Sequence, residues 1–289
     1  MTPLTSPRVI TTAAELASWS RGVHALGEQV TLVPTMGNLH RGHLALVSEA
    51  AKLGGRVVVS IFVNPTQFGA GEDFDRYPRT LDADIDALQG SGADIVFAPS
   101  ADEVYPPGAE QELLSAGPVG EVLEGATRPG HFDAVVRVCR RLFDMSAADS
   151  AVFGQKDAQQ LHVVHQMATS LSKPVRIVSV PTVRDADGLA LSSRNAYLSD
   201  EDRRTAVSLP RALEETEVSL NAGSDLSAAI GAARLGLSSQ GGLDLDYFEA
   251  VNPETFEKAG DGDGEVLLVA AISVGGTRLI DNRLVSRGK

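Results

Sequence analysis

The stretch VTLVPTMGNLHRGHLALVSEAAKLG, residues 30–54, decides the fold that the sequence predicts. It opens with an apolar, β-branched run that is typical of a buried strand and that ends at Pro34. A helical pattern begins around Arg41, and Gly37 and Gly42 allow the connecting backbone to turn tightly. A buried strand that leads directly into a helix is the unit from which parallel sheets are built.

The same alternation of strand and helix recurs through the first two thirds of the chain. Apolar runs within residues 56–63, 93–100, 150–154 and 175–183 predict further buried strands, with helical patterns between them. Crossover connections of this length predict an α/β fold, in which helices cover both faces of a parallel sheet. After a boundary near 185–195, helical stretches and then three strands predict a small, mostly antiparallel sheet.

The composition is that of a soluble globular protein and narrows the classes of function. A length of 289 residues suggests two domains, or one large domain with an appendage. A formal charge of −13 argues against a nucleic-acid surface, which needs clustered lysine and arginine. The sequence shows neither a secretory leader nor about 20 consecutive apolar residues, so we expect no membrane association and a cytoplasmic location. The single cysteine, Cys139, is interpreted as a buried thiol rather than a nucleophile.

The charge is unevenly distributed along the chain. Residues 195–289 carry nine basic and 16 acidic residues, whereas residues 128–194 carry nine basic and six acidic ones. Small anionic ligands are therefore expected at the motifs of this positively charged middle segment rather than at the acidic C-terminal third.

Two histidines, His40 and His43, lie three residues apart at the start of the predicted helix. This spacing places both imidazoles on one side of the first turn, where free N–H groups favour an anion. An imidazole there can donate hydrogen bonds to phosphate oxygens that gain charge in a transition state. We interpret the pair as phosphate-binding rather than as surface histidines. Zinc ligation is a weaker alternative, because the HEXXH spacing and a third ligand are missing.

Polar side chains follow other predicted strands and helix starts. Asn64 and Gln67 come at the carboxyl end of a strand, where ligands of open α/β sheets bind, and they could pair with the hydroxyls or carboxylate of a small substrate. The alternative is an ordinary turn with local side-chain bonds. Arg128 and His131 precede a helix and could cap an anionic carboxylate.

Two later segments suit phosphates. In SAVFGQKDAQQL, Gly154 permits close backbone approach and Lys156 offers a mobile cation, with Asp157 at the helix start. In the loop that ends in Ser192-Ser193-Arg194, two hydroxyls and a guanidinium can grip a polyphosphate.

Alternating carboxylates mark the segment DFDRYPRTLDADIDAL. Asp82, Asp84 and Asp86 could hold Mg²⁺ through water, since hard oxygen ligands suit that ion. A solvated helix face is the other interpretation of such a run.

The segments PTMGNLHRGH, FVNPTQF, YPRT, RPGHF, FGQKDAQQL and VPTVRDADGLALSSRNAYL occur in this order and together resemble the pantoate:β-alanine ligase family. The resemblance runs from about residue 30 to 200 and continues weakly to TRLIDN near the end. The H-x-G-H motif alone also marks aminoacyl-tRNA synthetases and other nucleotidylyltransferases, but the whole set does not.

The resemblance implies a Rossmann-like, doubly wound domain over residues 1–188 and a smaller α+β lid domain over 189–289, usually in a homodimer. It also implies a two-step reaction that uses ATP and Mg²⁺. Pantoate is first adenylated with loss of pyrophosphate, and β-alanine then displaces AMP. The expected partners are therefore these small molecules.

The family's functional residues carry over to matching positions of this chain. His43 is implied as the catalytic acid, with His40 beside it on the phosphates. Gln67 and Gln160 are implied to hold pantoate, and Gln67 and Tyr77 to lie near β-alanine. Asn64 and Arg128 complete the expected substrate-binding set. The implied ATP site comprises Met36, Gly37, Asn38, Leu39, His40, Arg41, Gly42, His43, Gly154, Gln155, Lys156, Asp157, Val183, Leu191, Ser192, Ser193 and Arg194. Within that set, the β- and γ-phosphates are assigned to Lys156, Ser192, Ser193 and Arg194.

Two positions depart from the family pattern. Ala83 interrupts the acidic run that some members carry, so a metal role rests on Asp84. Ala158 replaces a tyrosine and leaves a smaller side chain near the expected nucleotide pocket.

Two other functions stay open at this stage. A nucleotidylyltransferase that leaves AMP on its product gives Gln67 and Gln160 no evident purpose. A tRNA-binding synthetase fragment or a regulatory nucleotide-binding module is disfavoured by the acidic C-terminal third.

Overall fold

The computed structural model describes residues 6–108 and 114–287. The chain divides into two compact units, the first formed by residues 1–155 and 159–181 and the second by residues 156–158 and 182–289. The sequence predicted a domain boundary between residues 188 and 189, a few residues after the end of the first unit at residue 181. That boundary stays a prediction.

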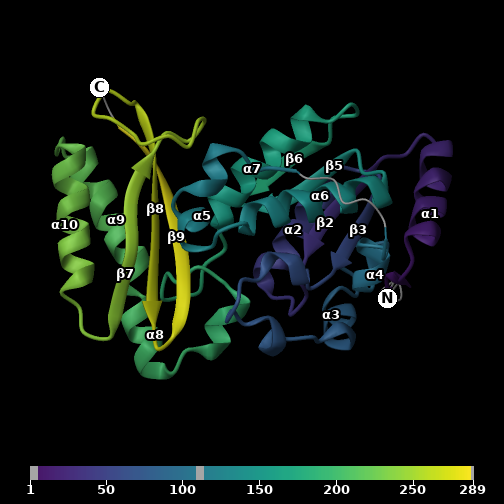
Figure 1. Ribbon diagram of the computed structural model, residues 1–289, viewed down its shortest axis with the longest axis horizontal. Helices are drawn as coiled ribbons and strands as arrows, with labels where there is room; N and C mark the ends of the chain where they lie inside the picture. Colours follow the sequence, from purple (N-terminus) through teal and green to yellow (C-terminus); the bar gives the residue numbers. More distant parts are fainter. Residues whose placement is uncertain (1–5, 109–113, 288–289) are drawn as a thin grey trace. The chain divides into compact units, whose positions relative to one another are not determined.

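The first unit is built on a six-stranded sheet in which every pair of neighbours is parallel (Figure 1). This confirms the predicted doubly wound, Rossmann-like α/β fold. The strand order is β1-β4-β3-β2-β5-β6. The strands are β1 (Arg8–Ile10), β2 (Val30–Thr35), β3 (Arg56–Ile61), β4 (Ile95–Phe97), β5 (Ser150–Gly154) and β6 (Arg176–Val180).

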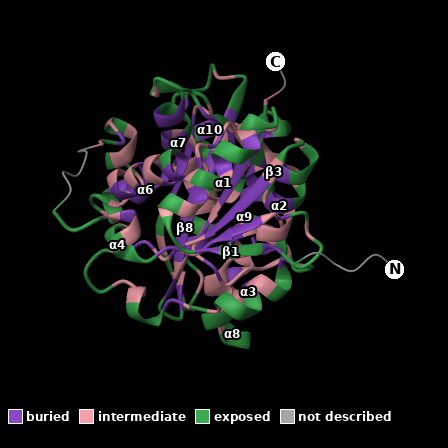
Figure 2. Ribbon diagram, turned by 90° about the vertical axis from the view of Figure 1, so that its right-hand side faces the viewer, coloured by how far each residue is buried: buried purple, intermediate pink, exposed green. Residues whose placement is uncertain are grey.

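Seven helices accompany this sheet in the part of the chain that the structure describes. They are α1 (Ala13–Ala25), α2 (Arg41–Lys52), α3 (Leu81–Ala87), α4 (Ala101–Val104), α5 (Glu124–Thr127), α6 (His131–Ser146) and α7 (Ala158–Ser170). Successive residues of β2 point to opposite faces, so Leu32 packs with residues of α1, α6 and α7, whereas Val33 packs with residues of α2. The four inner strands are accordingly buried, the edge strands β1 and β6 less so, and the helices are exposed on their outer sides (Figure 2).

The strand order reverses between β2 and β5. From β2 the chain passes through α2 to β3 on one side, and from β5 it passes through α7 to β6 on the other. Such a switch point leaves a crevice outside the carboxyl ends of the two strands, where open α/β sheets bind ligands. In this chain those ends are Thr35 and Gly154.

The second unit contains the predicted antiparallel sheet, with order β7-β8-β9. Its elements are α8 (Asp200–Ala206), α9 (Ser208–Asn221), α10 (Leu226–Ser238), β7 (Leu243–Val251), β8 (Glu265–Val274) and β9 (Thr277–Ser286). Ser199 caps α8 by accepting a hydrogen bond from the Asp202 N–H at 3.1 Å. Two helices, α8 and α9, follow this cap, and Pro210 lies in the first turn of α9, where its missing N–H is tolerated.

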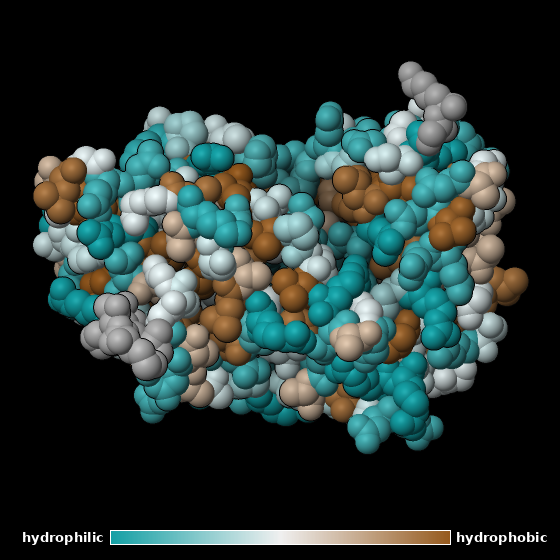
Figure 3. Space-filling model, turned by 180° about the vertical axis from the view of Figure 1, so that it is seen from behind, coloured by the Kyte–Doolittle hydropathy of each residue, from teal (hydrophilic) through white to brown (hydrophobic). Residues whose placement is uncertain are grey.

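The surface of the described residues mixes polar and apolar side chains. On the face in Figure 3, hydrophobic residues form small groups among hydrophilic ones. In residues 6–108 and 114–287 there is no helix of the length and apolarity that crossing a membrane requires. Cys139 is buried in the core of the first unit, as predicted, and this burial raises the pKa of its thiol to about 12.

Candidate active site

A tight turn joins β2 to α2 and begins the candidate site. The buried Thr35 hydroxyl donates to the Ser60 carbonyl at 2.7 Å and accepts from the Gly37 N–H at 3.2 Å. Gly37 and Asn38 then take positive φ angles of 84° and 49°. Two left-handed residues in succession turn the chain sharply, which glycine and asparagine tolerate better than other residues. The turn places His40 at the start of α2.

The two histidines cap α2 reciprocally. The Nδ1 atom of His40 accepts the Gly42 N–H at 3.1 Å, and the Nδ1 atom of His43 accepts the His40 N–H at 3.2 Å. Their ring centroids lie 4.1 Å apart, as the predicted common side of the first turn requires. Because each Nδ1 is an acceptor, each neutral ring carries its proton on Nε2. The pair is therefore suited to donating two Nε2–H groups to an anion.

Zinc ligation gains no support from the geometry. Each imidazole uses one nitrogen on the backbone. No group of three or more histidine, cysteine, aspartate or glutamate residues with metal-binding geometry occurs within 6–108 and 114–287.

The three aspartates of the 81–87 helix differ in their surroundings. Asp82 and Asp86 are exposed, as the solvated-face interpretation predicts. Asp84 is 2% exposed and accepts hydrogen bonds from the Asn38 and Leu39 N–H groups at 3.0 and 2.7 Å. This geometry favours a role in holding the turn over the magnesium role that the sequence suggested.

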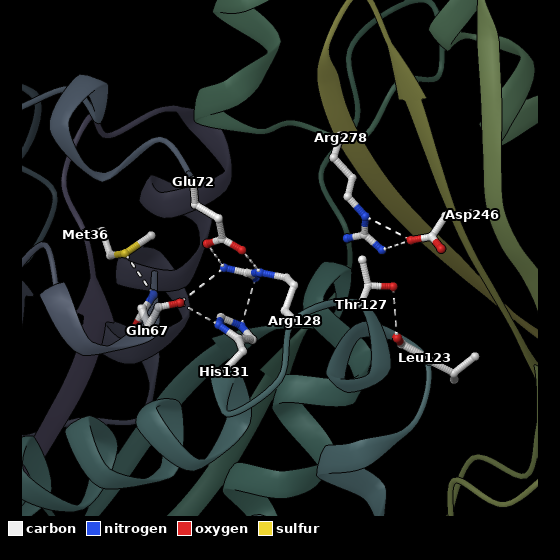
Figure 4. A network of polar contacts seen from close by, with 9 residues as sticks. All are labelled: Met36, Gln67, Glu72, Leu123, Thr127, Arg128, His131, Asp246 and Arg278. Carbon is white, nitrogen blue, oxygen red and sulfur yellow. Dashed lines mark hydrogen bonds and ion pairs between the residues drawn. The ribbon is translucent and has the colours of Figure 1, made fainter. Parts of the chain in front are cut away.

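Asn64 and Gln67 form a chain of amide contacts at the end of β3. Asn64 is 1% exposed, and its Nδ2 donates to Gln67 Oε1 at 3.1 Å, while its Oδ1 accepts from the Tyr105 hydroxyl at 3.1 Å. Gln67 Nε2 in turn contacts Met36 Sδ at 3.0 Å, so that Gln67 lies beside the turn after β2 (Figure 4). Asn64 thus orients Gln67, whose side chain is the less buried of the two. Tyr105 was not anticipated from the sequence.

Arg128 binds a carboxylate of its own chain. Its Nε and Nη2 atoms each donate to Glu72 at 2.7 Å, which is the bidentate pairing expected between a guanidinium and a carboxylate (Figure 4). Its Nη1 donates to His131 Nε2 at 3.0 Å. His131 therefore carries its proton on Nδ1, which donates to the Gln67 carbonyl at 2.9 Å. In the structure this pair anchors the backbone of Gln67, and its capping of a substrate carboxylate stays a prediction.

His131 is held neutral by this arrangement. Burial, together with the neighbouring Arg128 charge, lowers its pKa from 6.5 to about 4. In the unfolded chain the pKa is about 6.5, so between these two values the unfolded state binds more protons. The resulting stability is complete above the unfolded pKa and is lost as the pH falls towards the folded one.

We therefore expect the free energy of unfolding to fall as the pH decreases from about 6.5 to about 4, and His131→Gln to reduce that fall. Urea denaturation at a series of pH values measures this slope. His165→Gln is the matched control, because His165 is exposed on the same unit. Equal slopes in the wild type and in His131→Gln would contradict the assignment.

Three glutamines follow β5 in the chain and differ in their surroundings. Gln155 Nε2 donates to Ser179 Oγ at 3.2 Å. Gln159 is buried and donates to the carbonyls of Val119 and Val122, so it supports the segment before α5. The expected substrate residue, Gln160, is only partly buried.

The structure also shows the surroundings of two further expected residues, Tyr77 and Gly154. Tyr77 is buried, with its ring edge-on to Phe68 at 5.8 Å between centroids, so it packs within the 68–77 segment. Gly154 lacks a side chain at the end of β5, where a Cβ would lie 3.9 Å from Leu46 of α2.

Lys156 and Asp157 belong to the second unit and come after β5 and Gln155 in the chain. The Lys156 ammonium lies 3.8 Å from the Asp157 carboxylate, and its side chain is 19% exposed. The Lys156 carbonyl accepts a hydrogen bond from Asn282 Nδ2 at 2.8 Å, which ties this short segment to β9.

The remaining expected phosphate residues follow a small hairpin of the second unit. Leu191 N–H donates to the Val183 carbonyl at 2.9 Å, and Ser192 Oγ accepts from the Arg194 N–H at 3.2 Å. Arg184 fastens the hairpin through a bidentate pair with the buried Asp281, at 2.6 and 2.9 Å. The fold thus presents Leu191, Ser192, Ser193 and Arg194 as one short segment.

The sequence and fold are similar to those of one group of enzymes. The family model described as pantoate-beta-alanine ligase matches residues 8–284. The pantothenate synthetase of Leifsonia xyli subsp. xyli is 50% identical over 279 residues, which are 96% of each chain.

Two solved structures extend the comparison. The pantothenate synthetase of Thermus thermophilus is 44% identical with a TM-score of 0.89, covering 96% of this chain and 98% of that one. A Francisella tularensis pantoate-beta-alanine ligase, solved with β-γ ATP and β-alanine, is 30% identical with a TM-score of 0.79, covering 96% and 97%. A match over nearly the whole chain, on a fold with paired histidines at its switch point, places this protein in the pantoate-beta-alanine ligase family.

Proposed function

We propose that this protein joins pantoate and β-alanine in an ATP-dependent reaction that releases AMP and pyrophosphate. The observation that carries the proposal is the reciprocal cap of His40 and His43, which holds two Nε2–H donors at the carboxyl end of β2. Donors fixed before the reaction stabilise developing phosphate charge without reorganisation. The ligand named for the Francisella tularensis relative, β-γ ATP with β-alanine, supports the same chemistry.

The first step is attack of a pantoate carboxylate oxygen on the α-phosphorus of ATP. The new C(O)–O–P bond forms as the bond to the β-phosphate oxygen breaks, and pyrophosphate leaves with that electron pair. His40 and His43 donate hydrogen bonds to phosphate oxygens as their charge grows. Lys156, Ser192, Ser193 and Arg194 supply the positive charge and hydroxyl donors that the departing pyrophosphate needs.

The second step forms the amide. The β-alanine amine attacks the acyl carbon of pantoyl adenylate, AMP leaves, and the nitrogen loses a proton to solvent. Gln67, oriented by Asn64, holds the pantoyl hydroxyls so that the acyl carbon is correctly placed. Gln160 and Tyr77 remain further substrate residues in this proposal.

Mg²⁺ fits the reaction through ATP rather than through a ligand set of the protein. Asp84 directs both carboxylate oxygens at backbone N–H groups, and the described ranges hold no cluster of three or more potential ligands. When bound to ATP, Mg²⁺ neutralises phosphate charge. On the family resemblance we also propose a homodimer, a cytoplasmic location and a lid role for residues 189–289.

The test is substrate dependence with the purified protein. We expect labelled pyrophosphate to exchange into ATP only when pantoate is present, and AMP to be released in full turnover only when β-alanine is added. Cleavage of ATP that neither acid supports would contradict the proposal. Mass analysis of the product separates ligation from nucleotidyl transfer, because a retained adenylyl group would indicate the latter.

A further inference from the structure

Asp84 is a buried residue of α3, and its carboxylate contacts the turn between β2 and α2. Its Oδ2 accepts the Asn38 N–H at 3.0 Å and its Oδ1 accepts the Leu39 N–H at 2.7 Å. The Thr80 hydroxyl adds a third donor at 3.3 Å. Three donors converge on one carboxylate that is 2% exposed, which is how proteins compensate a buried charge.

The positive φ angles of the turn explain why these donors converge. Gly37 and Asn38 have φ angles of 84° and 49°, and consecutive N–H groups in such a turn form a concave site for an anion. Here the anion is a side chain of the same protein. A Cβ atom at Gly37 would lie 3.0 Å from Asp84 Oδ2, so the carboxylate is packed directly against the turn.

The contact continues through the backbone to the histidines. Leu39, which Asp84 holds, directly precedes His40, and the His40 N–H is accepted by His43 Nδ1. A shift of the turn therefore changes where both Nε2–H groups point. Because the Asn38 and Leu39 N–H groups are already engaged by Asp84, the histidine side chains are the donors that this turn directs at phosphate.

A magnesium role conflicts with these contacts. The N–H groups present the positive ends of their dipoles to the carboxylate, so a cation placed between them would be repelled. On the same helix, Asp82 and Asp86 are exposed and Ala83 has no carboxylate.

We propose that Asp84 is a positioning residue for adenylation, an internal anion that fixes the turn after β2 and thereby the two histidines. This inference rests on the proposed function. The isosteric change Asp84→Asn removes the charge and turns one acceptor into a donor that faces an N–H group. We expect it to lower kcat for pantoate-dependent pyrophosphate exchange by about 10- to 10²-fold, because small misplacements of catalytic groups have effects of this size.

Three readouts distinguish positioning from other roles. The KM for pantoate and the Mg²⁺ concentration for half-maximal rate should stay within about twofold of wild type, because a positioning residue binds neither pantoate nor Mg²⁺. In a His43→Ala background, the additional loss from Asp84→Asn should shrink to less than about threefold, since residues that act through one another are not additive. Asp82→Asn is the matched control, and its kinetics should be those of the wild type.

Each outcome either supports or overturns the positioning role. Recovery of Asp84→Asn by higher Mg²⁺, an unchanged kcat, or a full additional loss in the His43→Ala background would each overturn the proposal. If Asp84→Asn does not fold, Thr80→Val decides, because it removes the third donor and should lower the same kcat by a smaller factor; an unchanged kcat in Thr80→Val would then overturn it. A wild type without pantoate-dependent exchange would instead overturn the proposed function.

Discussion

Replacing His43 with alanine should lower the rate of pantoyl adenylate formation by about 10²- to 10³-fold, the loss found when one transition-state donor is removed. The substitution removes an Nε2–H donor. It also removes the Nδ1 acceptor of the His40 N–H, so the remaining histidine loses part of its support. Single-turnover measurement with ATP and pantoate, before β-alanine is added, isolates this step.

Two further variants define what His43 contributes. His43→Gln keeps an N–H donor and should recover part of the rate if hydrogen bonding, rather than proton transfer, is the main contribution. His165→Ala is the control, because His165 is exposed on α7. Near-normal adenylation in His43→Ala would remove the basis of the proposed mechanism.

The second large effect is expected for Lys156→Ala, at about 10²-fold in the same single-turnover rate. Asn282 holds the Lys156 backbone, so the variant removes a cation from a segment that stays in place. A cation that neutralises departing pyrophosphate stabilises the transition state more than the ground state. We therefore expect the loss mainly in kcat, with a smaller change in the KM for ATP.

Lys173→Ala is the matched control for this prediction. Lys173 is an exposed lysine that pairs with Asp149 at 3.0 Å, so its loss removes the same charge at another place. An equal decrease in Lys156→Ala and Lys173→Ala would show that net charge, and not the position of Lys156, sets the rate.

The sequence predicted those parts of the fold that depend on local patterns. The apolar runs at β2 and β5 are buried strands close to the expected bounds, because a strand covered on both faces needs mainly apolar residues. Strand β1 was missed, since Ile10 is the one buried residue of its three and no apolar run marks it. The helix start at Arg41 was predicted correctly because the turn residues mark it.

The contacts of the site were harder to predict because their partners are remote in sequence. Asp84 binds backbone N–H groups some 45 residues away, and any residue type carries such groups, so the sequence shows only the carboxylate. Arg128 and Glu72 are 56 residues apart in different loops, and nothing in either segment indicates the other. The motif singled out the two histidines, but their tautomers follow from hydrogen bonds that only the folded turn provides.

The pairing of Arg128 with Glu72 has a consequence for substrate choice. A guanidinium that already holds a carboxylate offers little selection among small organic acids on the basis of charge. In the proposed function, selection then falls to neutral amides such as Gln67, which distinguish molecules by their hydroxyl groups. A site of that kind rejects acids that lack the hydroxyls, because the amides that would bind them are left without partners. Discrimination in this protein would therefore come from the alcohol groups of pantoate and not from the acid group that reacts.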